Sequence, residues 1–378
     1  MLYFNSMNVL IVFTYNYSLK DWKNTGNLEK ELSIYKKLHN DYKINFTFLT
    51  YGDEEDLKIK VDCPGIKVIP IYKYLKKYKN KKLNFLQSLI IPFKIKKHIT
   101  NIDLIKQNQL LGSWVSIILK IIFKVKLFIR TGYDMYLFTK EENKSKLKSG
   151  LYYLLTFVTI KLSDLYSVTS KSDLEFFNTK FLNENIIYRP NWVLNDKYYN
   201  ITNRSTNKIL SVGRLEYQKN YDLLISLFKN TNFTIDIVGS GSEKQNLITL
   251  AKKNNVNINF LGNLENSELE KLYRQYTFYF STSLFEGNPK TVLEAMSNGC
   301  IVFLSNIPNH SELVEDGLNG FLFDFEEKEL IKKLGEVISS KSTLNKISYN
   351  AFNTVLEHNS FTSLVNKEHE DYLLLTRI

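Results

Sequence analysis

Residues 278–304 read FYFSTSLFEGNPKTVLEAMSNGCIVFL, and this stretch decides the fold. An apolar, strand-like run at Phe278–Ser281 is followed by a helical stretch at Pro289–Ser297 and by a second apolar run at Ile301–Leu304. Strands that alternate with helices are typical of βαβ units, whose strands form a parallel sheet with helices on both faces. The stretch therefore predicts an α/β protein.

The same alternation extends outward from this stretch in both directions. The second half contains three more predicted strand–helix pairs: Lys208–Val212 with Tyr221–Phe228, Phe233–Val238 with Glu243–Lys253, and Ile258–Leu261 with Ser267–Arg274. The first half contains seven predicted strands, near Val9–Phe13, Asn45–Leu49, Lys67–Ile69, Leu104–Lys106, Leu127–Arg130, Leu165–Thr169 and Asn185–Tyr188. A chain of 378 residues is long enough for two domains. The simplest architecture is two Rossmann-like domains that face each other across a cleft, with ligands at the carboxyl ends of the strands.

A polar stretch without apolar period, Asn195–Asn207, marks the predicted domain boundary. We expect an amino-terminal domain at residues 1–194, a carboxy-terminal domain at residues 195–360, and a closing helix at residues 361–378 that can pack back on the first domain. The six residues before Met7 look like a dispensable extension or an upstream start, and no signal peptide is visible.

Two other apolar runs, Leu110–Phe123 and Leu151–Ile160, are candidate membrane spans. Lys120 interrupts the first run and the second is short, whereas a span needs roughly 20 apolar residues. Both runs are therefore predicted to be buried core helices.

Cysteine and histidine are too sparse for a disulfide scaffold or a metal centre. The two cysteines have no CxxC spacing, and the five histidines show no metal-ligand spacing. This composition suits a reducing compartment, so a cytoplasmic location is expected.

Positive charge is concentrated in the first half of the chain. Residues 1–200 contain 32 Lys and Arg against 18 Asp and Glu, a balance of +14, whereas residues 201–378 contain 18 against 21, a balance of −3. Within Lys67–Lys126 there are 14 lysines and one acid, Asp103. Three interpretations compete: a compositional bias with a solvated face, attraction to an anionic membrane, and nucleic-acid binding. No nucleic-acid motif accompanies the lysines, so nucleic acid is not expected as a partner.

The segment SVGRLEYQKNYDLLI, residues 211–225, has the pattern of an anion site. A predicted strand ends at Gly213, and Arg214 and Lys219 flank a short loop that enters a helix. A helix amino terminus offers free N–H groups and partial positive charge, while Arg and Lys bind phosphate oxygens. The alternative is a surface turn with incidental cations. A second glycine turn, at Gly239 and Gly241 in VGSGSE, would let a ligand approach the backbone.

Two carboxylates mark the stretch that opened this section. Asn288 is a good N-cap and Pro289 a good first helical residue, so Glu286 is predicted to be free to meet a ligand hydroxyl. Glu294 lies inside the helix, where it could accept from two adjacent hydroxyls of a ribose. The alternative is a purely structural pair of acids.

The segment EGNPKTVLEA resembles the E-x7-E motif of the retaining glycosyltransferases of family 4, which have the GT-B fold and include enzymes of bacterial polysaccharide biosynthesis. LSVGRLEYQKN, VGSGSE, FLGNLENSELEKLY and NHSELVEDGLNGFLF follow the family's order between Leu210 and Phe323. In the first half, SLKDWKNTGNLEKE, IRTGYD and YRPNWV resemble the family's acceptor domains. Two positions depart from the family: LIKQNQLLGSWV lacks a histidine that many members carry, and Leu194 stands where an Asp is usual.

The resemblance implies a role for each matching residue. Glu286 would hold the donor sugar and stabilise the reacting centre, Arg214 and Lys219 beside Gly213 would bind the diphosphate, and Glu294 would bind the ribose. The other implied donor contacts are Asn288, Lys290 and Thr291, with the backbone near Leu264 at the base. No metal and no cofactor are implied. Candidates for the acceptor side of the cleft are Gly26, Trp114, Arg130 and Tyr133, each of which could equally be a structural residue.

The expected function is transfer of a sugar from a nucleotide-diphosphate sugar to a hydroxyl of a glycan or lipid-linked acceptor in surface polysaccharide synthesis. The expected enzyme is hexosyltransferase-like, retaining and metal-independent, with peripheral attachment to the inner face of an anionic membrane as a candidate location. The alternatives are a GT-B epimerase or phosphorylase that uses the same donor site, a non-catalytic GT-B partner subunit, and a basic binding module.

Overall fold

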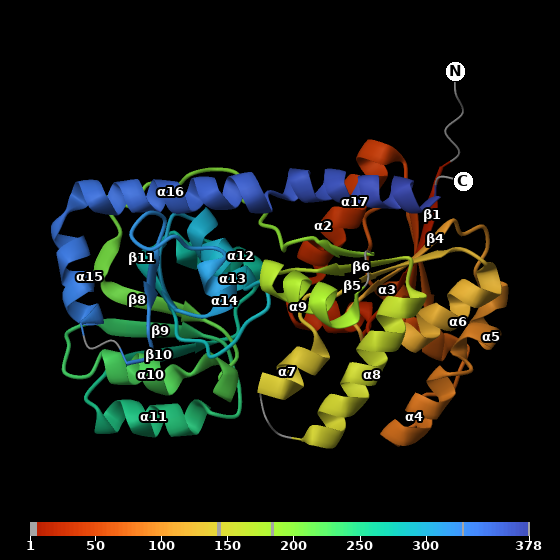
Figure 1. Cartoon of the computed structure of the whole chain (residues 1–378), viewed down its shortest axis with the longest axis horizontal. Coiled ribbons are helices and arrows are strands. Elements are labelled where there is room, and N and C mark those ends of the chain that lie inside the picture. Colours follow the sequence, from red (N-terminus) through yellow and green to blue (C-terminus); the bar gives the residue numbers. More distant parts are fainter. Residues whose placement is uncertain (1–5, 142–144, 183–184, 327–328, 377–378) are drawn as a thin grey trace. The chain divides into compact units, whose positions relative to one another are not determined.

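The computed structural model describes residues 6–141, 145–182, 185–326 and 329–376, and its packing divides the chain into two units (Figure 1). One unit is formed by residues 1–189 with residues 364–378, and the other by Pro190–Ser363. The first five residues of the expected extension and the last two of the expected closing helix lie outside the described residues. Each unit is an α/β domain built on one parallel sheet, as the alternating pattern predicts.

The amino-terminal unit contains a parallel sheet of seven strands in the order β3-β2-β1-β4-β5-β6-β7. The interior strand β1 pairs with β2 on one side and β4 on the other, so the strand order reverses there, and ligands of such sheets bind beside that reversal. Its residues Val9–Val12 are buried, as expected for a strand covered on both faces. The strand bounds are β1 Asn8–Val12, β2 Asn45–Thr50, β3 Ile66–Pro70, β4 Leu104–Asn108, β5 Lys126–Arg130, β6 Leu165–Val168 and β7 Ile186–Tyr188.

The helices of this unit include both apolar runs that the sequence assigns to the core. The first forms α6, which buries Val115, Ile117 and Leu119 as predicted. The second lies in α8, where the prediction of a buried helix holds for Ile160 but is wrong for Leu151 and Leu154, which are exposed. The bounds are α1 Leu19–Asn24, α2 Leu28–Tyr42, α3 Glu54–Lys58, η1 Ile71–Lys73, α4 Lys81–Ser88, α5 Ile91–Ile95, η2 Lys96–His98, α6 Ser113–Phe123, α7 Met135–Glu141, α8 Lys146–Leu162 and α9 Lys171–Phe181.

The closing helix α17, Phe361–Thr376, packs on the amino-terminal unit. The ring of His369 stacks on Tyr42 at 3.6 Å between centroids, and Arg189 Nε donates to Asp371 Oδ2 at 2.8 Å. The ammonium of Lys106 on β4 forms a fully buried ion pair with Glu368 of α17. Polar pairs as well as apolar contacts therefore hold this helix against the sheet.

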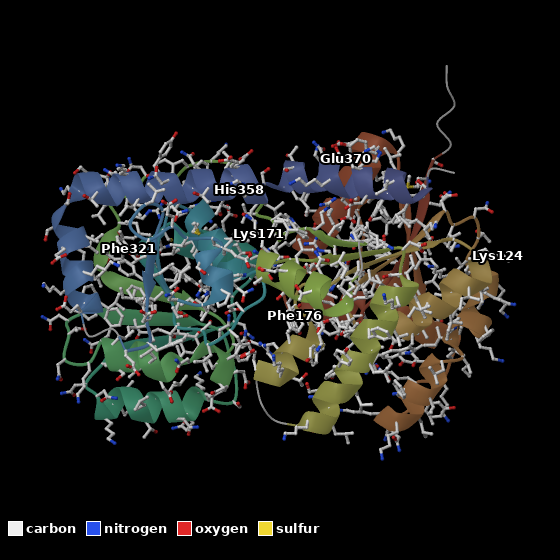
Figure 2. The ribbon with its side chains drawn as sticks, in the orientation of Figure 1. Lys124, Lys171, Phe176, Phe321, His358 and Glu370 are labelled. Atoms are coloured by element: carbon white, nitrogen blue, oxygen red, sulfur yellow. The ribbon has the colours of Figure 1, made fainter. Side chains whose placement is uncertain are left out.

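The carboxy-terminal unit contains a parallel sheet of six strands in the order β10-β9-β8-β11-β12-β13. Three phenylalanines stack through its core: Phe280 on Phe303 at 4.8 Å, and Phe303 on Phe321 at 4.6 Å, the last labelled in Figure 2. The strand bounds are β8 Ser205–Val212, β9 Thr234–Val238, β10 Asn257–Gly262, β11 Tyr276–Ser281, β12 Ile301–Ser305 and β13 Phe321–Phe323. The helix bounds are η3 Tyr217–Lys219, α10 Tyr221–Leu227, α11 Lys244–Lys253, α12 Asn266–Tyr273, α13 Lys290–Ser297, α14 Pro308–Ser311, α15 Leu330–Ser339 and α16 Lys341–Asn359.

All twelve predicted strands are present, with ends that differ from the expectation by at most three residues. The edge strand β13 was not predicted as a strand, because three residues are too few to show a period.

Candidate active site

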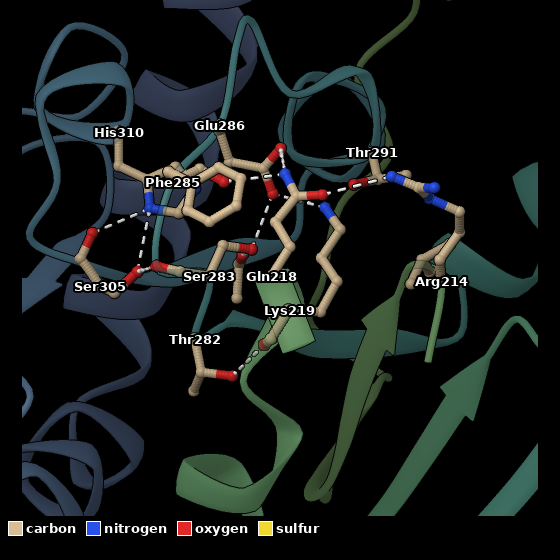
Figure 3. Close-up of polar contacts among 12 residues, drawn as sticks. Arg214, Gln218, Lys219, Thr282, Ser283, Phe285, Glu286, Thr291, Ser305 and His310 are labelled. Carbon is tan, nitrogen blue, oxygen red and sulfur yellow. Dashed lines mark hydrogen bonds and ion pairs between the residues drawn. The ribbon is translucent and has the colours of Figure 1, made fainter. Parts of the chain in front are cut away.

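Two loops of the carboxy-terminal unit are joined at the carboxyl ends of β8 and β11. The hydroxyl of Thr282 donates to the carbonyls of Lys219 and Asn220, at 2.9 Å each. The N–H of Leu284 donates to the carbonyl of Gln218 at 2.9 Å. These bonds bring the η3 turn after β8 against the loop after β11, so residues 67 positions apart in the chain share one site (Figure 3).

Glu286 is the centre of this site. Its carboxylate forms an ion pair with Lys219 and accepts from Ser283 Oγ at 2.7 Å and from Gln218 Nε2 at 3.4 Å. Only 8% of its side chain is exposed. Burial acts to raise the pKa of Glu286, but the charge of Lys219 and the hydrogen bonds from Lys219 and Ser283 outweigh it and hold that pKa below its ordinary value. The carboxylate is therefore ionised at neutral pH. It does not cap α13, and its contact with a ligand hydroxyl stays a prediction.

A chain of hydrogen bonds extends from Glu286 to a buried histidine. Ser305 Oγ donates to the carbonyl of Ser283 at 2.6 Å, and Ser283 Oγ in turn donates to Glu286. His310 Nδ1 lies 2.8 Å from the carbonyl of Ser305, so Nδ1 carries the hydrogen, because a carbonyl oxygen only accepts. Burial lowers the pKa of His310 to about 4, which keeps the imidazole neutral and leaves Lys219 as the cation that pairs with Glu286.

Arg214 follows the end of β8 and is exposed, and its guanidinium donates to Gln218 Oε1 at 3.3 Å. Because Gln218 also donates to Glu286, the two predicted diphosphate ligands and the predicted catalytic acid belong to one network. Gly213 lies under Lys219: a side chain there would meet Lys219 Cε at 2.9 Å.

The glycines of VGSGSE contact protein backbone. A Cβ on Gly239 would lie 2.0 Å from the carbonyl oxygen of Gly213, and a Cβ on Gly241 would lie 2.2 Å from that of Leu215. The two glycines let the loop after β9 pack against the loop after β8. The approach of a ligand to the backbone of this turn stays a prediction.

The predicted cap of α13 is also wrong. Pro289 is the N-cap, the helix begins at Lys290, and no side chain caps it. Asn288 instead binds the segment that enters this unit: its Oδ1 accepts from the N–H of Asn191 at 2.9 Å, and its carbonyl accepts from Asn191 Nδ2 at 2.6 Å. Asn359 Nδ2 donates to the carbonyl of Asn191 at 2.8 Å, so Asn288 takes part in a buried asparagine cluster.

The remaining donor-side candidates lie along α13 and beside it. Thr291 accepts from the hydroxyl of Tyr279 at 3.0 Å, and the ammonium of Lys290 lies 5.3 Å from the ring centroid of Trp192. Glu294 accepts from the hydroxyl of Tyr273 at 3.4 Å. Leu264 packs against the core of the unit. Of the predicted residues, Lys219 and Glu286 therefore pair directly, Arg214 joins them through Gln218, and Gly213 lies against Lys219. The other donor-side candidates have other contacts: Asn288, Lys290, Thr291, Glu294 and Leu264.

The four acceptor-side candidates all lie in the amino-terminal unit. Gly26 has φ 71° just after α1. Trp114 Nε1 donates to Ser88 Oγ at 2.8 Å. Arg130 is buried near Glu368, and Tyr133 is exposed beside Phe138.

Three residues of the site were not predicted: Gln218, Ser283 and His310. Ser283 stands three positions before Glu286 and Gln218 directly before Lys219, so local spacing was a usable signal for both. His310 lies in α14, beyond β12, and no sequence signal connects it to Glu286. Across the part of the chain that the structure describes, no group of three or more His, Cys, Asp or Glu side chains is arranged to hold a metal ion.

Sequence comparison shows that this chain is similar to glycosyltransferases. Residues 198–354 match the family model described as glycosyl transferases group 1. An uncharacterized glycosyltransferase of Haemophilus influenzae is 30% identical over 196 residues, 49% of this chain and 54% of the relative, so the chain spans about half of that protein. The O-antigen biosynthesis glycosyltransferase WclY of Escherichia coli is 27% identical over 297 residues, 75% of this chain and 77% of WclY.

A third relative is named for its lipid-linked acceptor. It is the GalNAc-alpha-(1->4)-GalNAc-alpha-(1->3)-diNAcBac-PP-undecaprenol alpha-1,4-N-acetyl-D-galactosaminyltransferase of Campylobacter jejuni, 24% identical over 56% of this chain and 61% of the relative.

Solved structures confirm the GT-B fold. Sucrose-phosphate synthase of Thermosynechococcus elongatus superposes with a TM-score of 0.81 and 16% identity, over 98% of this chain and 99% of that one. HepE of Anabaena, solved in complex with UDP-glucose, superposes with a TM-score of 0.75 and 17% identity, over 98% of this chain and 100% of HepE.

Proposed function

We propose that the protein is a retaining glycosyltransferase that moves a sugar from a nucleoside-diphosphate sugar to an acceptor hydroxyl. The observation that carries the proposal is the network of Arg214, Lys219 and Glu286 at the carboxyl ends of β8 and β11, in the unit that matches the glycosyl transferases group 1 model. An exposed guanidinium and a nearby ammonium suit a diphosphate, and an ionised carboxylate suits sugar hydroxyls.

The proposed reaction takes place on one face of the sugar. The bond between the anomeric carbon and the diphosphate oxygen breaks, and the acceptor oxygen bonds to the same carbon from the same side. The departing phosphate oxygen takes the acceptor's proton. Arg214 and Lys219 stabilise the charge that develops on the diphosphate, and Glu286 stabilises the positive charge that develops at the anomeric carbon. No separate protein base is needed, which agrees with the missing amino-terminal histidine.

The proposed acceptor is a glycan or a lipid-linked sugar of surface polysaccharide synthesis. It is supported by the relatives named for O-antigen synthesis and for an undecaprenol-linked substrate. Peripheral attachment to an anionic membrane is part of the same proposal, because a lipid-linked acceptor lies in a membrane and the amino-terminal unit carries the lysine excess.

The test is a screen of nucleoside-diphosphate sugars, beginning with UDP-glucose, for thermal stabilisation and for release of the free diphosphate. We expect at least one donor to stabilise the protein and to be consumed slowly, and Glu286→Gln to abolish consumption. Consumption should continue in EDTA, because the cations that we place at the diphosphate are side chains. Loss of turnover in EDTA that Mg²⁺ restores would contradict metal independence. Formation of sugar 1-phosphate only with added inorganic phosphate would indicate a phosphorylase instead.

A further inference from the structure

Helix α8 exposes a row of leucine side chains, whereas a helix of a water-soluble domain normally buries such a row. Leu147, Leu151 and Leu154 are spaced by four and three residues, which places them on one helical face, and they are 77%, 61% and 57% exposed. The residues that α8 buries are Thr156, Thr159 and Ile160, so two of the three are polar. A surface helix normally buries its apolar stripe and exposes its polar face, so the domain's own core does not explain this arrangement.

A second exposed stripe runs along α4 and α5. Leu83, Leu86, Ile90 and Phe93 are spaced by three, four and three residues, and all four are exposed. The buried residues of these helices include Ile91 and Ile95, which pack inward as expected. Exposed large apolar side chains are ordinary when they are scattered singly, but a run at helical spacing marks an interaction surface.

Both stripes belong to helices that pack against α6. Trp114 of α6 donates from Nε1 to Ser88 at the end of α4, and its ring lies 5.3 Å from that of Phe85. Ser113 Oγ lies 2.8 Å from Thr159 Oγ1 of α8. Figure 1 shows α4 and α8 extending to the lower edge of the amino-terminal unit, while α17 lies along its upper edge. We call the two stripes the apolar patch: Leu83, Leu86, Ile90, Phe93, Leu147, Leu151 and Leu154.

The segments that carry the apolar patch contain basic residues and no acidic ones. No Asp or Glu occurs in residues 63–102, and the 17 residues of α8 contain none. Exposed lysines flank both stripes: Lys76, Lys77, Lys79, Lys81, Lys82, Lys94, Lys96, Lys97, Lys146 and Lys148. A compositional bias of the whole chain would add lysines without acids to both halves, yet residues 201–378 have 18 basic and 21 acidic residues. The charge is therefore specific to this region.

We propose that the apolar patch is the membrane-binding face of the protein, with α8 and the α4–α5 segment lying in the interface of an anionic bilayer. The inference deepens the proposed membrane attachment and rests on it. A helix of 17 residues is shorter than the roughly 20 that span a bilayer, so α8 lies in the plane of the surface. The leucines enter the boundary between headgroups and acyl chains, and the lysines contact lipid phosphates.

The experiment is flotation of the full-length protein with two kinds of vesicle. One is phosphatidylcholine alone, and the other contains about one third phosphatidylglycerol, an anionic lipid. Leu151→Glu places a carboxylate in the apolar patch, and Leu374→Glu makes the same change at an exposed leucine of α17. Donor consumption is measured in parallel with a soluble assay, because neither leucine belongs to the candidate active site, and sedimentation velocity records the oligomeric state.

We expect wild type and Leu374→Glu to float with anionic vesicles only, and Leu151→Glu to lose about tenfold or more of that binding while donor consumption is unchanged. Equal binding of Leu151→Glu and wild type would overturn the proposal, because lysines alone would then carry the attachment. It would equally be overturned if no variant floated, or if wild type were a dimer that Leu151→Glu dissociates, since a second copy would then cover the patch. If the wild-type protein consumed no donor, that result would count against the proposed reaction and not against membrane binding.

Discussion

Lys219 and Glu286 form a nearly buried ion pair between the loops that follow β8 and β11. The side chain of Lys219 is 15% exposed and that of Glu286 is 8% exposed, so water screens the attraction only weakly. A donor diphosphate that binds Lys219 must compete with Glu286 for the ammonium group. Donor binding and the placement of the proposed catalytic carboxylate are therefore linked through one lysine.

Glu286→Gln should lower the rate of transfer by about a thousandfold, because a neutral amide cannot stabilise positive charge at the anomeric carbon. The amide keeps the shape and its one oxygen can still accept from Ser283, but its nitrogen cannot accept from Gln218 and it carries no charge opposite Lys219. The thermal midpoint should therefore fall in Glu286→Gln, and it should fall further in Glu286→Ala, which also loses activity and has no acceptor for Ser283. Turnover near the wild-type rate in Glu286→Gln, with the fold intact, would remove Glu286 from the reaction.

Arg214→Ala should weaken the binding of UDP by about tenfold or more, because hydrogen bonds to charged groups contribute about 1.5–3 kcal/mol and 1.4 kcal/mol corresponds to a factor of ten. Arg214 is exposed, so its loss should leave stability unchanged. Calorimetric titration of UDP measures the effect, with Lys208→Ala, an exposed cation further back on β8, as the control. Equal affinities of the two variants for UDP would show that Arg214 contributes to UDP binding only through the net charge of the protein.

The strands and the donor-side loop could be predicted from sequence because their signals are local. Strand β11, the turn at Glu286 and helix α13 follow one another within a single stretch, so period and spacing identify them. The pairing of Glu286 with Lys219 and its connection to His310 could not be found in this way, because Lys219 lies 67 residues earlier and His310 lies after the next strand. The cap of α13 was mistaken because Asn288 has the right side chain for a cap but hydrogen-bonds Asn191 instead. Burial of α8 was mistaken because an apolar run does not say which side faces the core.

His310 should make the protein less stable in mild acid. Burial depresses its pKa to about 4 in the folded protein, while an unfolded histidine titrates near 6.5. Between those values the unfolded chain binds the additional proton, so the free energy of unfolding should fall as pH falls from 6.5 to 4, by up to about 3 kcal/mol, and the contribution is lost in full below pH 4.

The measurement is urea unfolding of wild type and His310→Asn across this pH range. The asparagine amide can still donate to the carbonyl of Ser305, but it does not titrate. The slope of the unfolding free energy against pH should therefore decrease by the amount that corresponds to about one bound proton. His358→Asn, at an exposed histidine, is the control. The same slope in His310→Asn as in wild type would show that His310 is not the group that titrates.

Ser283→Ala should shift the acid limb of the pH–rate profile upward. The Ser283 hydroxyl stabilises the ionised form of Glu286, so its removal raises the pKa of that carboxyl, and activity that depends on the carboxylate is lost at a higher pH. Ser283→Thr, which keeps a hydroxyl, should restore the wild-type profile. Ser348→Ala removes another buried serine hydroxyl, one that donates to the carbonyl of Gly299, and should leave the profile unmoved. A shift of the same size in Ser348→Ala would indicate a general effect of destabilisation.

The buried pair of Lys106 and Glu368 should show unequal costs when each partner is removed. Glu368 interacts with both Lys106 and Arg130, so Glu368→Leu leaves two buried cations without their carboxylate, whereas Lys106→Met leaves Glu368 beside Arg130. Removing one partner of a buried ion pair lowers the free energy of unfolding by about 3–5 kcal/mol. We expect the loss for Glu368→Leu to lie in or above that range and the loss for Lys106→Met to lie below it. Urea unfolding gives these free energies, and hydrogen exchange across residues 361–376 reports whether α17 opens first. The double variant should recover part of the loss. Equal costs for the two single variants would mean that Arg130 does not share the charge of Glu368, and that α17 is held by the Lys106 pair alone.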